Sequence, residues 1–538
     1  MRRFSQIRNV GVWRGPSRWF AFSRSLQALL VVVSAALFIT GTAFADSYIA
    51  LFGVFSLFIA NIMYGAFRLR TRSLFLFLHF GIFLFWLTRP FISLIYGSDA
   101  WQGSLESTSF SLSVIYLTMI CLVAGNELYE LSGAGKSGSS MFSSWDFPSF
   151  DCRRMERKES ERRRGAFGLA PSDCDWKRIL RWVSLFVFVV AAAAALYKGY
   201  SMLSYMQGML YEEYFLTSES AYVSSSVSSL AAMLPYAMCA YLATFPKRLP
   251  STIVLLANVA VAVPELLIGT RGSFVLAVVF LAFYYLLRNT VDKSSGEGAW
   301  IGRREILLVA LGLPVGVFAM GMITYLRDVN GVGPEGILLA LADSLHMQGV
   351  TFKTLQYGYD VMDSVNGLGF RGYSFGSLID AVTQGFIGQL FLGCDLLPTT
   401  NSVELATQGS YYSHAMSYFA HSNYLGGEGY GSAYVMELFA DFGYAGVVLG
   451  SLFLGFAFAW LSERAGKSWL VTVFCLMAAR KVFHMPRGEF AEWISCLWST
   501  RFWLCIVGIV FVSLVVYWIG RKVRMGTLKP VKSEGAGL

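Results

Sequence analysis

Several arginines in this sequence stand where a charged side chain is costly. In residues 265–279, ELLIGTRGSFVLAVV, Arg271 lies in a four-residue gap between two long apolar runs. An arginine held in lipid costs about 2.5–3.5 kcal/mol even on the lower insertion scales. Four further arginines lie beside apolar runs or in a long polar stretch between them: Arg89, Arg327, Arg371 and Arg480.

Arginines that gather at one membrane surface can bind a pyrophosphate group. The planar guanidinium donates to two phosphate oxygens at once and stays charged, which a pyrophosphate ligand requires. The alternative for each arginine is structural, with the side chain reaching the headgroup region or pairing with an acid such as Glu265 or Glu489. The sequence favours the binding role most for Arg271 and Arg327.

Candidate proton-transfer groups follow in residues 413–432, SHAMSYFAHSNYLGGEGYGS. Here His414 and His421 flank an aromatic stretch, and a neutral imidazole can take a proton from a hydroxyl group. Glu437 then enters an apolar run one turn before Asp441, and an acid at such depth usually faces a cavity rather than lipid. The alternative is that each histidine is exposed or satisfied by the core.

Metal-ligand spacing is not found among the histidines and cysteines. The histidines are too loosely spaced for a zinc site, and the sequence contains neither HExxH nor CxxC. We therefore predict no metal and no cofactor.

The elements that must position these residues are transmembrane helices. The chain of 538 residues is 55% hydrophobic and only 14% charged, whereas soluble domains are about 25% charged. Runs long enough to cross the bilayer predict an all-α polytopic membrane protein with twelve spans, at about 26–44, 48–67, 74–95, 110–128, 179–197, 224–245, 251–268, 272–289, 305–325, 435–461, 468–484 and 502–520.

The net charge of +9 is explained by topology rather than by nucleic-acid binding. Most Lys and Arg residues fall on alternate connections, which the positive-inside rule assigns to the cytoplasm. Both termini are then cytoplasmic, and the five arginines lie at the outer face or its span ends.

The spans divide the chain into six parts. We expect a basic, disordered cytoplasmic loop at 129–178 and a folded outer loop with amphipathic helices at 326–430. The remaining parts are spans one to four at 1–128, spans five to nine at 179–325, spans ten to twelve at 431–520 and a cytoplasmic tail at 521–538.

Residues 260–460 resemble a known family, the bacterial O-antigen polysaccharide polymerases of the Wzy type. The resemblance rests on three features in order: the GTRGSFVLAVVF turn, the long outer loop, and the Gly-rich stretch GGEGYGSAYVMELFADFGYAGVVLG that contains Glu437. The long inner loop at 129–178 departs from the family's compact arrangement.

The resemblance implies a metal-independent glycosyltransferase of the GT-C type in the bacterial inner membrane. It would transfer a glycan from undecaprenyl pyrophosphate to the next lipid-linked repeat unit at the periplasmic face. Arg271 and Arg327, helped by Arg371, Arg480 and Arg89, would hold the pyrophosphate. His421 or His414 would activate the acceptor hydroxyl, with Glu437 the next candidate. A chain-length regulator and a flippase are the further partners that this role suggests.

Two alternatives remain open from sequence. An O-antigen ligase shares the donor and the leaving group but uses a lipid A core acceptor. A lipid-linked oligosaccharide flippase or other transporter would place its ionisable residues near mid-membrane and often shows two related halves. The crowding of cations at one face favours the polymerase over the transporter.

Overall fold

The computed structural model describes residues 18–133, 173–206, 223–268, 270–294, 299–308, 337–385 and 388–526. In these parts the chain forms helices, turns and one isolated bridge between Ala465 and Ser468. The all-α fold predicted from composition is therefore confirmed.

Long apolar helices form the body of the molecule. Six are continuous: α1 (Arg18–Ala43), α2 (Ser47–Phe67), α5 (Leu105–Leu131), α7 (Asp173–Met206), α13 (Gly272–Ser294) and α23 (Thr500–Gly526). A seventh, α21 (Tyr434–Arg464), has a kink at Gly443. Three further spans are built from shorter segments in sequence: α3 (Leu69–Ile82), η1 (Phe83–Leu87) and α4 (Thr88–Ile95); α9 (Ser225–Ala231) and α10 (Leu234–Leu242); α11 (Arg248–Val261) and α12 (Val263–Ile268).

Ten helices of the described chain are long and apolar enough to cross a membrane. Of the other two predicted spans, 305–325 lies outside the described residues except for 305–308. The other corresponds to α22 (Trp469–Val482), which has 14 residues and is shorter than the roughly 20 that a full crossing needs. The count of twelve spans and the GT-C-like arrangement stay predictions.

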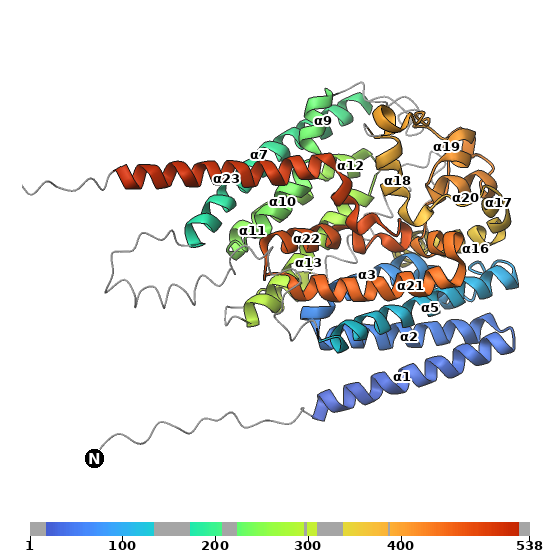
Figure 1. Cartoon of the computed structure of the whole chain (residues 1–538). Coiled ribbons are helices and arrows are strands. Elements are labelled where there is room, and N and C mark those ends of the chain that lie inside the picture. The colour runs from blue at the N-terminus through green and yellow to red at the C-terminus, as the bar shows by residue number, and fades with distance from the viewer. Residues whose placement is uncertain are drawn as a thin grey trace, which may run out of the picture.

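The helices run roughly parallel and antiparallel in one bundle, with the start of α1 and the end of α23 at the same end (Figure 1). We call the opposite end the distal end. There the short helices of the predicted outer loop gather (Figure 1): α15 (Ile337–Gln348), α16 (Val350–Asp360), α17 (Met362–Gly367), η3 (Tyr373–Phe375), α18 (Gly376–Thr383), η4 (Gly388–Leu392), α19 (Val403–Gln408), α20 (Tyr412–Ala420) and η5 (Tyr424–Gly426). Two more 3₁₀ turns, η6 (Met485–Arg487) and η7 (Glu492–Trp498), connect α22 to α23.

Within the predicted outer loop, two stretches have the apolar spacing of amphipathic helices, residues 334–363 and 374–393, and each is divided. The first is described from Ile337 and breaks into α15, α16 and α17, and the second into η3, α18 and η4. Gly349 separates α15 from α16 where the backbone of Arg89 leaves no room for a side chain, so close packing on α4 explains that break.

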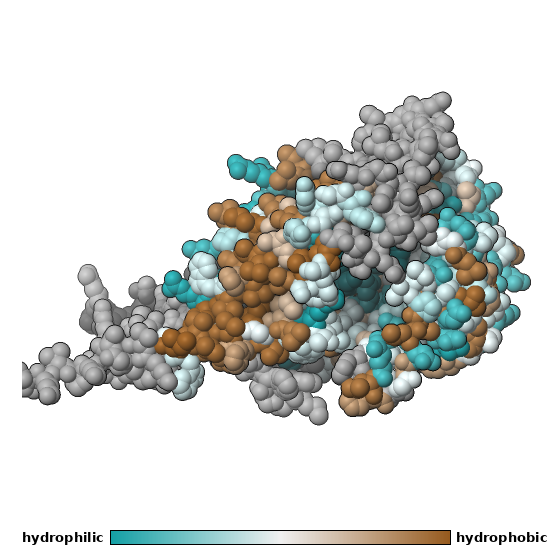
Figure 2. Space-filling view, turned by 90° about the horizontal axis from the view of Figure 1, so that it is seen from above, coloured by the Kyte–Doolittle hydropathy of each residue, from teal (hydrophilic) through white to brown (hydrophobic). Residues whose placement is uncertain are grey.

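The apolar surface lies where lipid would contact the bundle. Figure 2 shows a broad area of brown, hydrophobic side chains toward the end that carries the termini, and a mixture of teal, white and smaller brown areas at the distal end. Large exposed apolar side chains on α7 and α23 include Trp182, Phe186, Phe511 and Trp518. Inside the bundle, α5 and α21 approach closely because Gly125 and Gly455 each face backbone of the other helix, as small residues do in membrane helix pairs.

One buried arginine at the end opposite the distal end fastens α3 to α5. Arg72 is 1% exposed, and its guanidinium lies 2.7 Å from Oε1 of Glu130 and 3.0 Å from Oε1 of Glu127. It also donates to the carbonyl oxygen of Tyr64 at 2.9 Å. The charge is thus fully satisfied, which a buried guanidinium requires.

We expect Arg72→Met to lower the free energy of unfolding by about 3 kcal/mol, because two acids lose their buried partner. The measurement is the thermal stability of the detergent-solubilised protein by size-exclusion chromatography. Arg68→Met is the matched control, since Arg68 pairs with the same Glu130 but its side chain is 56% exposed, and such pairs contribute about 0–1 kcal/mol. Equal stability of the two variants would contradict the structural role of Arg72.

Candidate functional site

A buried aromatic cluster joins three segments at the distal end. The indole Nε1 of Trp86 donates to the carbonyl oxygen of Pro486 at 2.7 Å, and its ring stacks on Tyr434 at 5.6 Å. Trp86 lies in η1, a π-helical turn of the kind often found at functional sites. Tyr434 begins α21 and Pro486 lies in η6, so the cluster fixes these three elements together.

Two positively charged residues follow members of this cluster along the chain. Arg89 follows Trp86 by three residues, and its Nε is buried without a hydrogen-bond partner among the described residues. Arg487 follows Pro486, and its Nε lies 3.7 Å from the position that a Cβ at Gly431 would occupy. Burial lowers the pKa of Arg487, but a guanidinium stays charged at neutral pH.

A lysine of α16 adds to the positive charge beside Arg89. Burial and the nearby Arg89 charge both lower the pKa of Lys353. The ammonium of Lys353 donates to the carbonyl oxygen of Gln102 at 2.6 Å. We call these three residues the cationic group: Lys353 lies near Arg89, and Arg487 follows Pro486, which binds Trp86.

Aromatic rings extend from α16 to the predicted histidine His421. Tyr357, one turn after Lys353, lies 5.0 Å from the ring of Tyr430, which in turn lies 4.9 Å from the ring of His421. His421 ends α20 and its Nε2 is 3.6 Å from Oε2 of Glu428. The structure thus places His421 and the cationic group along one aromatic row.

The hydrogen-bond pattern bears on what His421 can do. The backbone N–H of Asn423 donates to its Nδ1 at 3.2 Å. A neutral imidazole that accepts at Nδ1 carries its hydrogen on Nε2, an assignment inferred from this network. In this arrangement the Nε2–H group of His421 can donate a hydrogen bond, and Nδ1 already accepts one.

His414 lies deeper, between aromatic residues. Its Nδ1 is 3.1 Å from the hydroxyl of Tyr424, and burial lowers its pKa. His414 is therefore neutral at physiological pH, as a general base must be.

Glu437 is 1% exposed and both of its carboxylate oxygens accept hydrogen bonds. Oε1 accepts from the hydroxyl of Ser432 at 2.6 Å, and Oε2 accepts from the backbone N–H of Phe490 at 2.8 Å. A carboxylate so enclosed cannot reach a substrate. It holds the segment after α22 against the start of α21, which is an orienting role.

Next to this contact lies Glu489, whose environment makes it titrate near neutral pH. Burial and the negative charge of Glu492 raise the pKa of Glu489 to about 7. Asp380 of α18 is nearby, its pKa also raised by burial, and it accepts from the hydroxyl of Tyr411 at 3.2 Å. A carboxyl with a pKa near the working pH is suited to general acid–base catalysis.

The partner acid Glu492 remains charged. Burial alone would raise its pKa, but hydrogen bonding to His484 and the positive charge of Lys481 outweigh burial and lower it to about 2. Lys481 Nζ lies 2.8 Å from Oε1 of Glu492, and His484 Nδ1 lies 3.4 Å from Oε2. Two neighbouring acids with widely separated pKa values are a common catalytic arrangement.

Arg371, another of the predicted arginines, lies near the start of α21 as well. Arg371 precedes η3, and its Nε is buried without a hydrogen-bond partner in the described part of the chain. Asp441 fixes η3 by accepting from the backbone N–H groups of Tyr373 and Ser374 at 3.0 and 2.7 Å. Arg371 therefore stands beside an ordered turn.

Arg480 and Arg271 point to a different part of the bundle. The guanidinium of Arg480 lies 5.9 Å from the ring centroid of Phe280 in α13. Arg271 directly precedes α13, about 13 Å farther along that helix at 1.5 Å per residue. Arg327 lies outside the described residues.

Sequence reasoning did not assign roles to Glu489, Asp380 or Glu492. The stretch 484–492, HMPRGEFAE, offered a signal, because it places charged residues of both signs between the last two apolar runs. The pKa separation of the acids could not be predicted, since it arises from burial and from contacts with α18 and α21.

The fold and this site define a polytopic helical membrane protein with cations, aromatic rings and titratable acids concentrated at one end. Compared with known families, the chain matches the O-antigen polysaccharide polymerase Wzy family over residues 171–518. The chain belongs to this family, as the sequence resemblance predicted. No curated protein and no solved structure matches it. Its general activity is O-antigen polymerisation on lipid-linked repeat units in a membrane.

Proposed function

We propose that the protein transfers a growing glycan from undecaprenyl pyrophosphate to a hydroxyl of the next lipid-linked repeat unit, at the periplasmic face of the inner membrane. The bond between the anomeric carbon and the pyrophosphate oxygen breaks, and a glycosidic bond to the acceptor oxygen forms. The acceptor proton goes to a protein base, and undecaprenyl pyrophosphate leaves.

One observation carries the proposal: Arg487 of the cationic group and Glu489, a carboxyl with a pKa of about 7, lie two residues apart in the connection between α22 and α23, which packs against the start of α21. Arg487 lies against Gly431, just before α21. Glu437, in the first turn of α21, accepts a hydrogen bond from the backbone N–H of Phe490, the residue after Glu489. Leaving-group binding and proton transfer thus have adjacent residues to perform them.

Each group has a role in this reaction. Arg89 and Arg487, with Arg371, neutralise the charge that develops on the departing pyrophosphate, an effect worth about 3–4 kcal/mol per well-placed donor. Glu489 takes the acceptor proton, and Glu437 positions it. His421 donates to the leaving pyrophosphate oxygen, and Tyr357 and Tyr430 stack on sugar faces. His414 is the second candidate base, and Arg271, Arg327 and Arg480 are further candidate pyrophosphate ligands.

The glycan profile of a deletion strain tests the proposed function. Loss of a polymerase leaves a single repeat unit attached to the core, and the plasmid-borne gene restores the ladder. Loss of a ligase would instead strand long chains on undecaprenyl pyrophosphate, and loss of a flippase would strand short units inside the cell. Either of the latter profiles would contradict the proposal; membership of the polymerase family favours the first.

We further propose that the distal end is periplasmic. Reporter fusions at Lys158 and at Gly358 are then expected to report opposite sides of the membrane, with Lys158 in the cytoplasm. The reason is the excess of Lys and Arg in the connections at the other end. The measurement is paired alkaline phosphatase and fluorescent protein activity in whole cells. A periplasmic report from Lys158 would reverse the orientation, and the same side for both would overturn the topology.

A further inference from the structure

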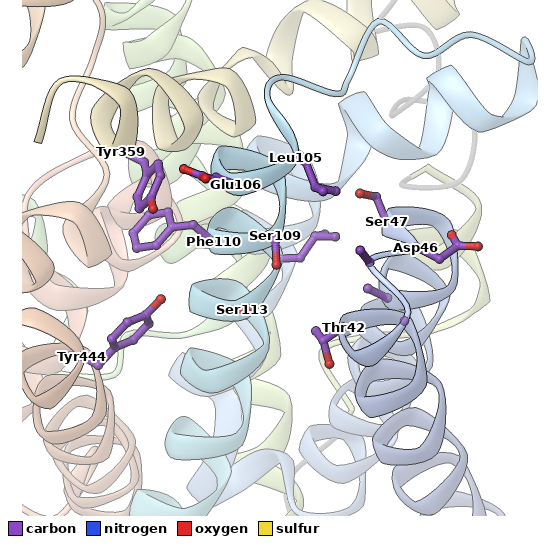
Figure 3. A pocket seen from close by; sticks show the side chains of 14 residues that line it. Thr42, Asp46, Ser47, Leu105, Glu106, Ser109, Phe110, Ser113, Tyr359 and Tyr444 are labelled. Atoms are coloured by element: carbon purple, nitrogen blue, oxygen red, sulfur yellow. The ribbon is translucent and has the colours of Figure 1, made fainter.

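A cavity of about 360 Å³ lies at the distal end, and neither the cationic group nor Glu489 is among the residues that line it. It is bounded by the α1–α2 turn, the first turns of α5, and residues of α16 and α21. Figure 3 shows α5 as its back wall, with Tyr359 and Tyr444 on one side and Thr42 on the other. Small-ligand sites have volumes of about 300–1,000 Å³, so the cavity can hold one or two sugar rings.

The sequence of α5 makes its wall polar. Glu106, Ser109, Phe110 and Ser113 occupy positions i, i+3, i+4 and i+7, which puts them on one face of the helix. All four line the cavity. A packing surface buried in a membrane bundle would not need a carboxylate there, and Glu106 is exposed.

Aromatic rings from α5, α16 and α21 form one side of the cavity. Phe110 and Tyr359 stack with centroids 4.5 Å apart, and Phe110 lies 6.2 Å from Tyr444. Aromatic rings beside hydroxyl and carboxylate groups suit a ligand that has both C–H groups and many hydroxyl groups. Carbohydrate is the class of molecule with both properties.

The charge of the lining argues against a phosphate or an anionic lipid headgroup. No Lys, Arg or His is among the residues that line the cavity, and Glu106 brings a negative charge. Asp46, the other acid, accepts from the backbone N–H groups of Tyr48 and Ile49 and is used as a helix cap. A hydrocarbon tail is disfavoured as well, because the hydroxyls of Ser109 and Ser113 would be left unpaired.

Helix α21 connects this cavity with the site described above. Asp441 fixes η3 near Arg371, and three residues later Tyr444 lines the cavity. Between them Gly443 breaks the helix with φ 60° and ψ −152°, a conformation essentially restricted to glycine. The break directs the two side chains to two different places.

We propose that this cavity is a carbohydrate subsite that holds one or two neutral or amino sugar rings of the glycan away from the reacting bond. The inference rests on the proposed function for its substrate, and it adds a site that retains the chain between transfers. Retention by such a subsite lengthens the product without affecting bond formation.

The first test is the glycan ladder of Tyr359→Ala and Tyr444→Ala in a strain lacking the native gene. We expect chains to become shorter, while the amount of the first condensation product and the protein level stay unchanged. Tyr359→Phe keeps the ring and is expected to keep the length. Phe511→Ala, which removes an exposed ring of α23, is the matched control. Wild-type ladders for both alanine variants would overturn the subsite.

The second test measures binding independently of polymerisation. Ser109→Cys is introduced in the full-length protein, with Cys394→Ser because Cys394 is partly exposed, whereas the other described cysteines are buried. Cys152→Ser and Cys174→Ser remove the two remaining cysteines of the sequence, and the protein is labelled with a maleimide. The repeat-unit oligosaccharide released from the host polysaccharide is expected to slow labelling. Tyr359→Ala is expected to raise the oligosaccharide concentration needed for this protection about 10-fold. This factor corresponds to about 1.4 kcal/mol, the size of one aromatic ring contact. Gln408→Cys, on α19, is the unprotected control.

The two tests separate the failure of the subsite from failure of the proposed function. A deletion profile that excludes polymerisation would reject the proposed function, whereas the labelling assay would still report whether sugar enters the cavity. Unchanged labelling at Ser109→Cys with oligosaccharide, or protection given equally by an anionic phospholipid, would overturn the carbohydrate assignment.

Discussion

Glu489→Gln is expected to reduce polymerisation by about 10²–10⁴-fold, the usual contribution of a general base, at unchanged protein level. Glutamine keeps the size of the side chain but cannot take a proton. The assay is the rate of glycan extension in membranes supplied with lipid-linked repeat units. Glu404→Gln is the matched control, because Glu404 is an exposed acid at the distal end, in the first turn of α19.

The pH profile separates a catalytic from a structural role for Glu489. Its carboxylate, the form that accepts a proton, appears as pH rises through about 7, so wild-type activity is expected to rise over the same range. The variant loses this rise. Folding raises the pKa of Glu489, so the wild-type protein loses stability as pH rises from the ordinary glutamate pKa to about 7. Glutamine does not ionise, so the variant is not expected to lose activity near pH 7 through unfolding. A variant with a wild-type rate and profile would leave His414 as the leading base.

Arg487→Lys is expected to reduce polymerisation by about 10²–10³-fold, the effect of removing one preorganised donor to a developing negative charge. Lysine keeps the positive charge but loses the planar pair of donors. Arg89→Lys is expected to behave in the same way. The measurement is the glycan ladder together with the protein level in the same membranes, and a normal ladder for both would exclude them as pyrophosphate ligands.

The same substitution at Arg271 decides between two locations for the pyrophosphate. If Arg271 binds it, Arg271→Lys lowers activity as severely as Arg487→Lys. If Arg271 only anchors the start of α13 at the interface, lysine restores nearly full activity, because both side chains can reach the headgroup region. In that case the pyrophosphate site is the cationic group at α4, α16 and η6.

The apolar runs predicted most of the fold because hydrophobic length alone identifies a membrane helix. The bounds of α2 and α5 lie within a few residues of the predicted 48–67 and 110–128 at most ends. The distal helices were harder to predict, because their breaks depend on contacts with other elements. Gly349 is an example: the break there follows from the backbone of Arg89, 260 residues earlier in the chain.

The site was predictable in its residue types and less so in its arrangement. Arg89, His421 and Glu437 could be identified as unusual, but the enclosure of Glu437 by Ser432 and Phe490 requires the folded chain. The importance of Glu489 could not be predicted, since an ordinary glutamate in a polar connection becomes titratable near pH 7 only through burial beside Glu492. Spacing carries no information on such an environment.

The break at Gly443 also marks a boundary along α21. From Tyr444 to Arg464 the helix has 21 residues, or about 31 Å at 1.5 Å per residue, which matches the roughly 30 Å of hydrocarbon in a bilayer. The turns before Gly443 then stand above the lipid, among the distal helices. A Cβ at residue 443 would meet nothing within 4 Å. The glycine is therefore required for the backbone conformation and not for close packing. Its kink lets the part of α21 after Gly443 face lipid, while the part before it is enclosed by the distal helices.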